Sequence, residues 1–230
     1  MLTVPDDRHH PLAEEFLQCI DAPSFPCVGA KAAVNRGGMR FVVARDFRSG
    51  WDDLRIMPAL LDIARRYRQD PIPFQSLVVL FERGATANER DFEERLWDRL
   101  QSLSDKDDWL GQHPDPRVAH DPGDPHFALS FGGEAFFVVG LHPCASRPAR
   151  RFSQPAMIFN LHDQFERLRA EGRYDKLRET IIGRDVALAG SVNPMLAKHG
   201  TISAARQYSG RAVEADWRCP FSGRGARDAA

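Results

Sequence analysis

Hydrophobic positions along the chain fall into two patterns, one with helical spacing and one made of short continuous runs. Apolar residues recur every three or four positions, which predicts amphipathic helices, in residues 11–20, 51–68 and 88–103. Runs rich in β-branched and aromatic residues, which predict strands, cover residues 39–45, 74–81, 126–131, 134–141 and 155–159. Gly132-Gly133 separates two of these runs and indicates a β-hairpin. We therefore expect an α+β protein with a mostly antiparallel sheet of about five strands packed by helices.

Local signals predict three further helices. A short helix begins around Cys27 and is stopped by Gly37-Gly38. Asn160 is expected to cap the next helix, with Asp163 three residues further on. The third covers residues 173–182. Cys27 would then lie at the positive end of a helix dipole, which favours a thiolate.

Two segments are predicted to lack regular structure. Residues 104–125 are rich in Asp, Pro, Gly and His, which predicts a long loop, either a lid over a site or a mobile excursion. Residues 222–230 are expected to form a disordered tail. A chain of 230 residues is long enough for one sizeable core. We expect one domain over residues 1–230, with its core at about 11–221.

Composition argues against several classes of partner. The chain is 43% hydrophobic and 27% charged, with a formal net charge of -1, so neither nucleic acid nor an anionic membrane surface is expected. The longest apolar run, Glu134–Leu141, is far shorter than the roughly 20 residues that a membrane helix needs. The first residues do not show a basic segment followed by an apolar one, which is the pattern of a signal peptide, so none is expected. Its four cysteines show no paired spacing, so we expect reduced thiols and a cytoplasmic protein.

The densest polar chemistry directly follows the predicted strand 134–141. Within residues 140–152 stand His142, Cys144, Ser146, Arg147, Arg150 and Arg151. Further motifs follow at residues 159–169, 184–185, 190–196, 207–211 and 217–221. Taken in this order, the motifs resemble the YqcI/YcgG family over roughly residues 22–221. That family contains heme-dependent N-hydroxylases, such as the pre-guanitoxin N-hydroxylase and the arginine-hydroxylating heme protein of D-cycloserine biosynthesis.

The resemblance implies a heme b-dependent oxygenase that hydroxylates a nitrogen of a guanidine substrate, arginine or a cyclic arginine derivative. Dioxygen and an external electron donor would be its partners, since the chain has no dinucleotide-binding Gly-x-Gly-x-x-Gly motif. The alternative from another class is a heme-binding sensor or carrier without turnover, and a third is a cofactor-free interaction domain. Ala204-Ala205-Arg206 departs from the family pattern, which has an acidic residue beside the Ala-Arg pair, so the substrate stays open.

Two side chains are candidates for the axial ligand of the heme iron. A Cys27 thiolate would push electron density toward the iron and favour O–O cleavage. Without a heme, Cys27 would be a small buried apolar residue. His142 directly follows a strand, and imidazole is a frequent heme ligand; the plainer interpretation is a hydrogen-bonded core histidine. We expect Cys27 as the ligand and keep His142 as the alternative.

The arginines after the strand are candidates for holding the heme propionates. Guanidinium groups pair best with carboxylates, often in bidentate fashion. We expect at least two of Arg147, Arg150 and Arg151 to hold propionates, with Ser146 and Arg211 also assigned to the cofactor. The plainer alternative is a solvated basic patch, which contributes little to binding or stability.

A guanidine or amine substrate needs carboxylate or amide acceptors and an aromatic wall for its flat cation. Candidates for these roles are Glu166, Asp185, Asn193 and Tyr208. We predict a catalytic set of His162, Asn193 and Tyr208. Asn193-Pro194 is equally typical of a turn, and Tyr208 of a core residue with one satisfied hydroxyl.

Overall fold

The chain folds around a five-stranded sheet in a computed structural model that describes residues 4–196 and 200–223. The strands are β1 (Met39–Asp46), β2 (Ser76–Arg83), β3 (Leu129–Phe131), β4 (Glu134–Leu141) and β5 (Ala156–Leu161). Their order in the sheet is β1-β2-β5-β4-β3. Only β1 and β2 pair in parallel, and the other neighbours are antiparallel. The prediction of an α+β fold with a mostly antiparallel sheet is therefore confirmed.

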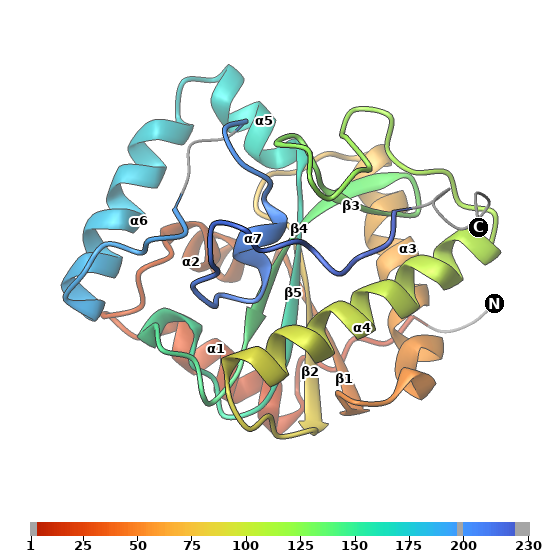
Figure 1. Cartoon of the computed structure of the whole chain (residues 1–230), viewed down its shortest axis with the longest axis horizontal. Coiled ribbons are helices and arrows are strands. Elements are labelled where there is room, and N and C mark those ends of the chain that lie inside the picture. Colours follow the sequence, from red (N-terminus) through yellow and green to blue (C-terminus); the bar gives the residue numbers. More distant parts are fainter. Residues whose placement is uncertain (1–3, 197–199, 224–230) are drawn as a thin grey trace.

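Seven α-helices surround the sheet within the described part of the chain (Figure 1). They are α1 (Pro11–Asp21), α2 (Val28–Asn35), α3 (Asp53–Gln69), α4 (Glu89–Trp109), α5 (Asp163–Ala170), α6 (Tyr174–Ala189) and α7 (Ala205–Tyr208). Two short 3-10 helices cover Gly50–Asp52 and Pro148–Arg150. None of the helices in residues 4–196 and 200–223 is long and apolar enough to cross a membrane.

Both faces of the sheet are buried, which explains why the strands are apolar at nearly every position. One face packs against α3, α4 and α7 in the larger core, around residues such as Val79 and Phe159. The opposite face packs against α1 and α2, around residues such as Val78 and Ile158. Neighbouring residues of a strand point to opposite faces, so β1, β2, β4 and β5 each supply both cores.

The helix α6 differs from the others because it does not pack directly on either core. Asp185 is the only buried residue among those described in this helix. Its neighbours are α2, α5 and the 3-10 helix at Pro148–Arg150, and it runs along the outer side of the molecule (Figure 1). The apolar side chains on its inner face are therefore left to line the space beneath it.

Several element boundaries differ from the sequence predictions. The helix α4 continues through Trp109, into the predicted loop, because Asp107 is fully buried and accepts a hydrogen bond from the Gly132 N–H at 2.9 Å. The remaining loop is anchored by Asp115, which accepts from the Ala135 N–H at 3.0 Å. Residues 224–230 of the predicted tail lie outside the described residues.

The predicted helix cap at Asn160 is wrong, because Asn160 lies within β5. Its amide Oδ1 accepts from the Ser76 hydroxyl at 2.8 Å, and its Nδ2 donates to the Phe137 carbonyl at 3.2 Å. Both partners stand opposite Asn160 in the neighbouring strands. The N-cap position of α5 falls instead on His162, which makes no side-chain capping bond.

Candidate functional site

Two adjoining chambers lie beneath α6, each about 270 Å³ in volume. The first chamber is lined by residues of α1, α2, the sheet, α5 and α6 and of the loops between them, including Cys27, Phe74, Asn160, Gln164 and Asp185. The second chamber is lined by residues such as Phe127, Phe137, His162, Arg169 and Arg178. Six residues line both chambers: Arg150, Phe165, Leu177, Ile181, Ile182 and Leu196. The walls are therefore largely apolar, with a few convergent polar groups, as in small-molecule sites.

Cys27 brings its thiol into the first chamber from the N-cap of α2. The Sγ atom accepts a hydrogen bond from the Ala30 N–H at 3.4 Å. Burial raises the pKa of the Cys27 thiol, whereas the N–H groups of Ala30 and Gly29 and the positive charge of Arg150 act in the opposite direction. The thiol is thus protonated in the free protein, but the surrounding N–H groups and charge favour a thiolate once a metal binds it.

Phe74 is a wall of the first chamber that the sequence prediction missed, because it assigned this residue to a strand. Its backbone has a φ of 64°, the left-handed region that bulky residues rarely adopt. A Cβ on Gly38 would lie only 2.3 Å from the Phe74 carbonyl oxygen, so the glycine permits this close approach. Gln164 holds the next residue, accepting from the Gln75 N–H at 3.0 Å. Strained residues held in this way often occur at functional sites.

The first chamber also receives two of the predicted arginines, each already engaged by the protein. Arg147 forms a buried ion pair with Asp185 and donates to the carbonyl of Ser191 at 3.0 Å. Its Nε is buried and has no hydrogen-bond partner among the described residues. Arg147 lies in the loop after β4, just before the 3-10 helix, and Asp185 belongs to α6, so the pair ties α6 to this loop.

Arg150 stands between the two chambers and lines both. Its guanidinium donates to the carbonyl oxygens of Gly140 at 3.1 Å, Tyr208 at 3.3 Å and Gln207 at 3.0 Å. Burial lowers the pKa of Arg150 to about 10, so the group is still charged at neutral pH. All three acceptors are neutral carbonyls, so no carboxylate in the described part of the chain forms a hydrogen bond with this positive charge.

His142 lies on the opposite side of the sheet from Cys27. Its neighbour Leu141 lines the first chamber, whereas the His142 ring stacks on Phe92 of α4 with centroids 4.1 Å apart. This reversal follows from the alternation of side chains along an extended segment. Neither ring nitrogen has a hydrogen-bond partner among the described residues, and burial lowers the pKa of His142 to about 4. The ring is therefore neutral and packed into the core at pH 7.

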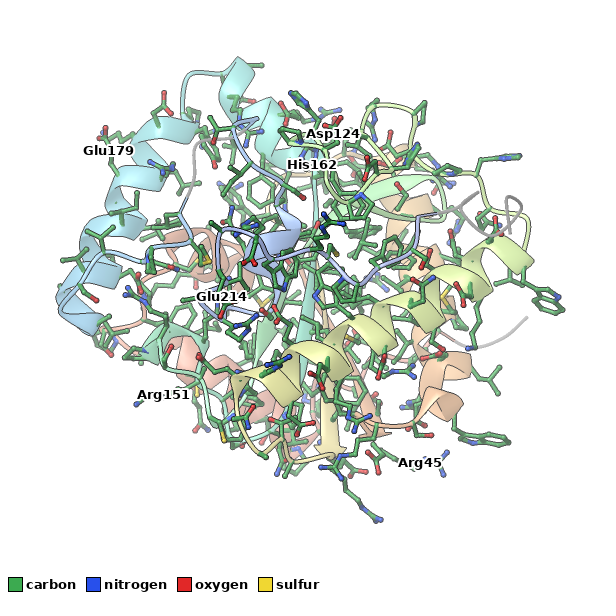
Figure 2. The ribbon with its side chains drawn as sticks, viewed as in Figure 1. Arg45, Asp124, Arg151, His162, Glu179 and Glu214 are labelled. Atoms are coloured by element: carbon green, nitrogen blue, oxygen red, sulfur yellow. The ribbon has the colours of Figure 1, made fainter. Side chains whose placement is uncertain are left out.

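Ser146 and Arg151 are exposed and lie away from the chambers. The Ser146 hydroxyl and N–H both bond the Glu89 carboxylate, each at 2.8 Å. Arg151 donates to the carbonyl of Ala145 at 2.7 Å and that of Ser146 at 3.1 Å. Figure 2 shows Arg151 at the outer edge of the molecule, well apart from His162. The contacts of Arg151 therefore stay within its own loop, whereas those of Ser146 join this loop to the start of α4.

Arg211 and Tyr208 are engaged on the α4 side of the sheet. The Arg211 Nε donates to Glu93 at 2.8 Å. Tyr208 is fully buried, stacks on Trp97 and donates its hydroxyl to the Phe136 carbonyl at 3.3 Å. Both residues thus have satisfied partners in the core. The structure does not bring them together with Cys27.

Asn193 and His162 do lie at the chambers, one at each. Asn193 lines the first chamber, and its Oδ1 accepts from the Met195 N–H at 3.0 Å in a local turn. His162 lines the second chamber, with its Nε2 3.7 Å from the Glu166 carboxylate. The chambers gather six of the sequence-predicted site residues: Cys27, Arg147, Arg150, His162, Asp185 and Asn193.

Comparison with known proteins places the chain in a family. No curated protein and no solved structure matches it. Residues 14–222, nearly the whole sequence and all of both chambers, match the model of the YqcI/YcgG family. The chain therefore belongs to the YqcI/YcgG family.

Proposed function

We propose that this protein is a heme-dependent oxygenase that hydroxylates a nitrogen of a guanidine substrate. One observation carries the proposal: the thiol of Cys27, at the start of α2, lines an apolar chamber beneath α6. A thiolate at a helix N-terminus would be a suitable ligand for a heme iron, and apolar walls suit a porphyrin. The thiol donor and the apolar walls of the first chamber therefore match the chemistry of a heme site. His142 fits less well, because its ring is packed against Phe92 on the other face of the sheet.

The remaining contacts to the cofactor would come from α6 and from two arginines. Leu177 and Ile181 supply apolar surface from α6. Arg147 and Arg150 each retain N–H donors beyond those used in the protein, since a guanidinium has five. These donors can meet the carboxylates of the cofactor. When bound, heme would supply an iron centre at which dioxygen is activated, with electrons from an external donor.

The protein itself would bind, orient and shield the guanidine. Asp185 and Asn193 line the first chamber, and their side-chain oxygens are the acceptors that a guanidinium requires. The apolar residues of α6 exclude water from the space beneath it, which strengthens these polar contacts. His162 lies in the adjoining chamber, where its imidazole can hold or deliver a proton.

The test is reconstitution with hemin, followed by reduction and addition of carbon monoxide. Cys27→Ala and His142→Ala are compared with the native protein, and Cys19→Ala is the control because Cys19 is exposed on α1. We expect a strongly red-shifted Soret band in the native protein and in the Cys19 variant, and its loss in Cys27→Ala. A band that survives Cys27→Ala but changes in His142→Ala would make His142 the ligand instead.

Turnover is then measured with reductant, dioxygen and guanidine compounds. N-hydroxylated product from the native protein, absent in Cys27→Ala, is the expected result. Heme binding without product from any guanidine would leave a sensor or carrier. Failure of the native protein to bind hemin would refute the proposal altogether.

A further inference from the structure

The helix α6 covers both chambers, although its own packing is weak. Leu177, Ile181 and Ile182 line both chambers, and each is only partly buried. A packed core buries such side chains almost completely. The segment at residues 104–125, for which the sequence left a lid open, is anchored by Asp107 and Asp115. The weakly packed cover of the chambers is therefore α6 and not that segment.

The polar contacts that fasten α6 are concentrated in its C-terminal part. Arg184 donates to the carbonyl oxygens of Pro23 at 2.6 Å and Phe25 at 3.1 Å. The next residue, Asp185, forms the buried ion pair with Arg147. These two neighbours hold the helix to the segment before α2 and to the loop after β4. Because hydrogen bonds to charged groups are stronger than neutral ones, this part of α6 is fixed.

The N-terminal half of α6, residues 174–182, has one polar or aromatic side-chain link to another element within the described part of the chain. The guanidinium of Arg169, in α5, stacks over the Tyr174 ring, 4.3 Å from its centroid. The Thr180 hydroxyl bonds back to the Lys176 carbonyl of the same helix at 2.8 Å, a contact that favours bending of a helix. This half therefore lies over the chambers with little to hold it down.

Gly183 separates the two parts of α6. It lies in the interior of the helix and is exposed, and a Cβ built there would meet no atom within 4 Å. Neither packing nor the helical backbone therefore requires a glycine at this position. Compared with alanine, glycine disfavours the helical state by up to about fivefold. A hinge explains this cost, because glycine absorbs changes in φ and ψ more readily than any other residue.

We infer that the N-terminal half of α6 is a flap that bends at Gly183 and uncovers both chambers. The other end of the flap is Gly172, in the turn between α5 and α6, where φ is 67°. When the stacking contact of Tyr174 breaks, the flap lifts, while Arg184 and Asp185 keep the rest of the helix in place. The inference concerns access to the chambers and not what they bind, so it does not depend on the proposed function.

Alkylation of Cys27 by iodoacetamide measures the opening of the flap, because the Cys27 thiol lines the first chamber. Mass spectrometry follows each cysteine of the full chain separately, and the exposed Cys144 is the internal reference. Three variants are compared with the native protein. Gly183→Ala stiffens the hinge, Tyr174→Ala removes the stacking contact, and Asp98→Ala is a control that raises helix propensity at an exposed position of α4.

Gly183→Ala should slow the alkylation of Cys27 by about fivefold, since alanine favours the unbent helix by that factor. Tyr174→Ala should speed it by about two- to fivefold, the scale of one exposed cation–π contact. The reaction of Cys144 in every variant, and that of Cys27 in Asp98→Ala, should match the native protein. An unchanged Cys27 rate in Gly183→Ala would overturn the flap. So would a comparable slowing in Asp98→Ala, because the thiol would then react only after unfolding of the whole protein.

Hydrogen exchange distinguishes a bend at Gly183 from fraying of the helix end. An α-helical N–H bonds the carbonyl four residues earlier, so the amides of residues 183–186 bridge the hinge, whereas those of residues 178–182 lie within the flap. A bend predicts the lowest protection at residues 183–186, and about fivefold more protection there in Gly183→Ala. Protection that rises steadily from residue 178 to residue 189 is the pattern of fraying and would refute the hinge.

Discussion

The buried ion pair between Arg147 and Asp185 should be the strongest single link between α6 and the rest of the fold. Each side chain is only 11% exposed. Asp185→Asn keeps the shape of the side chain but removes its charge, which leaves the Arg147 guanidinium uncompensated beside an apolar chamber. Breaking a buried pair in this way costs about 3–5 kcal/mol. We expect about 3 kcal/mol, the lower end, because Ser191 still accepts two hydrogen bonds from Arg147.

Urea unfolding followed by tryptophan fluorescence measures this change in the free energy of unfolding. The double variant Arg147→Met/Asp185→Leu should recover most of the loss, since apolar replacements remove both charges together. Arg173→Met is the control, because Arg173 and Glu171 form an exposed pair with side chains 57% and 53% accessible. This control should change stability by less than about 1 kcal/mol.

The reasoning would be refuted if Asp185→Asn destabilised the protein no more than Arg173→Met does. Solvent would then have to reach Arg147 in the native state, and α6 would not depend on the pair. A double variant as unstable as Asp185→Asn would also count against it, because packing and not charge would explain the loss.

Two further predictions concern the sheet face behind the site and the wall beside Cys27. Burial holds the pKa of His142 at about 4 in the folded protein, below its ordinary value of 6.5. The unfolded chain therefore takes up a proton at His142 once the pH falls below 6.5, while the folded protein does not. Stability should therefore drop by about 2 kcal/mol between pH 7 and pH 5, and urea unfolding of His142→Phe should lack this part of the pH dependence; an unchanged slope would contradict it. Gly38→Ala should destabilise by about 2 to 3 kcal/mol and weaken hemin binding by displacing Phe74, whose carbonyl blocks the new methyl. Gly37→Ala, with open space around it and a φ of 64°, should cost about 1 kcal/mol and leave hemin affinity unchanged in a spectral titration.

Patterns among near neighbours in the sequence determined the elements themselves. The apolar runs placed all five strands to within a few residues, and Gly132-Gly133 marked the hairpin between β3 and β4. The position of Cys27 at the start of α2 followed from its own sequence surroundings. Such features depend on local backbone preferences and on the alternation of side chains, which a linear sequence contains.

Contacts between distant segments were decided only by the tertiary structure. Leu141 and His142 are adjacent, yet one lines the first chamber and the other stacks on α4. Arg147 finds its carboxylate at Asp185, 38 residues away, and Arg150 finds carbonyls 57 and 58 residues away. The sequence shows six polar side chains within residues 140–152 as one group, but the fold sends them to different faces. The pairing order of the strands and the partner of each buried charge minimise the free energy of the whole chain, so no local pattern records them.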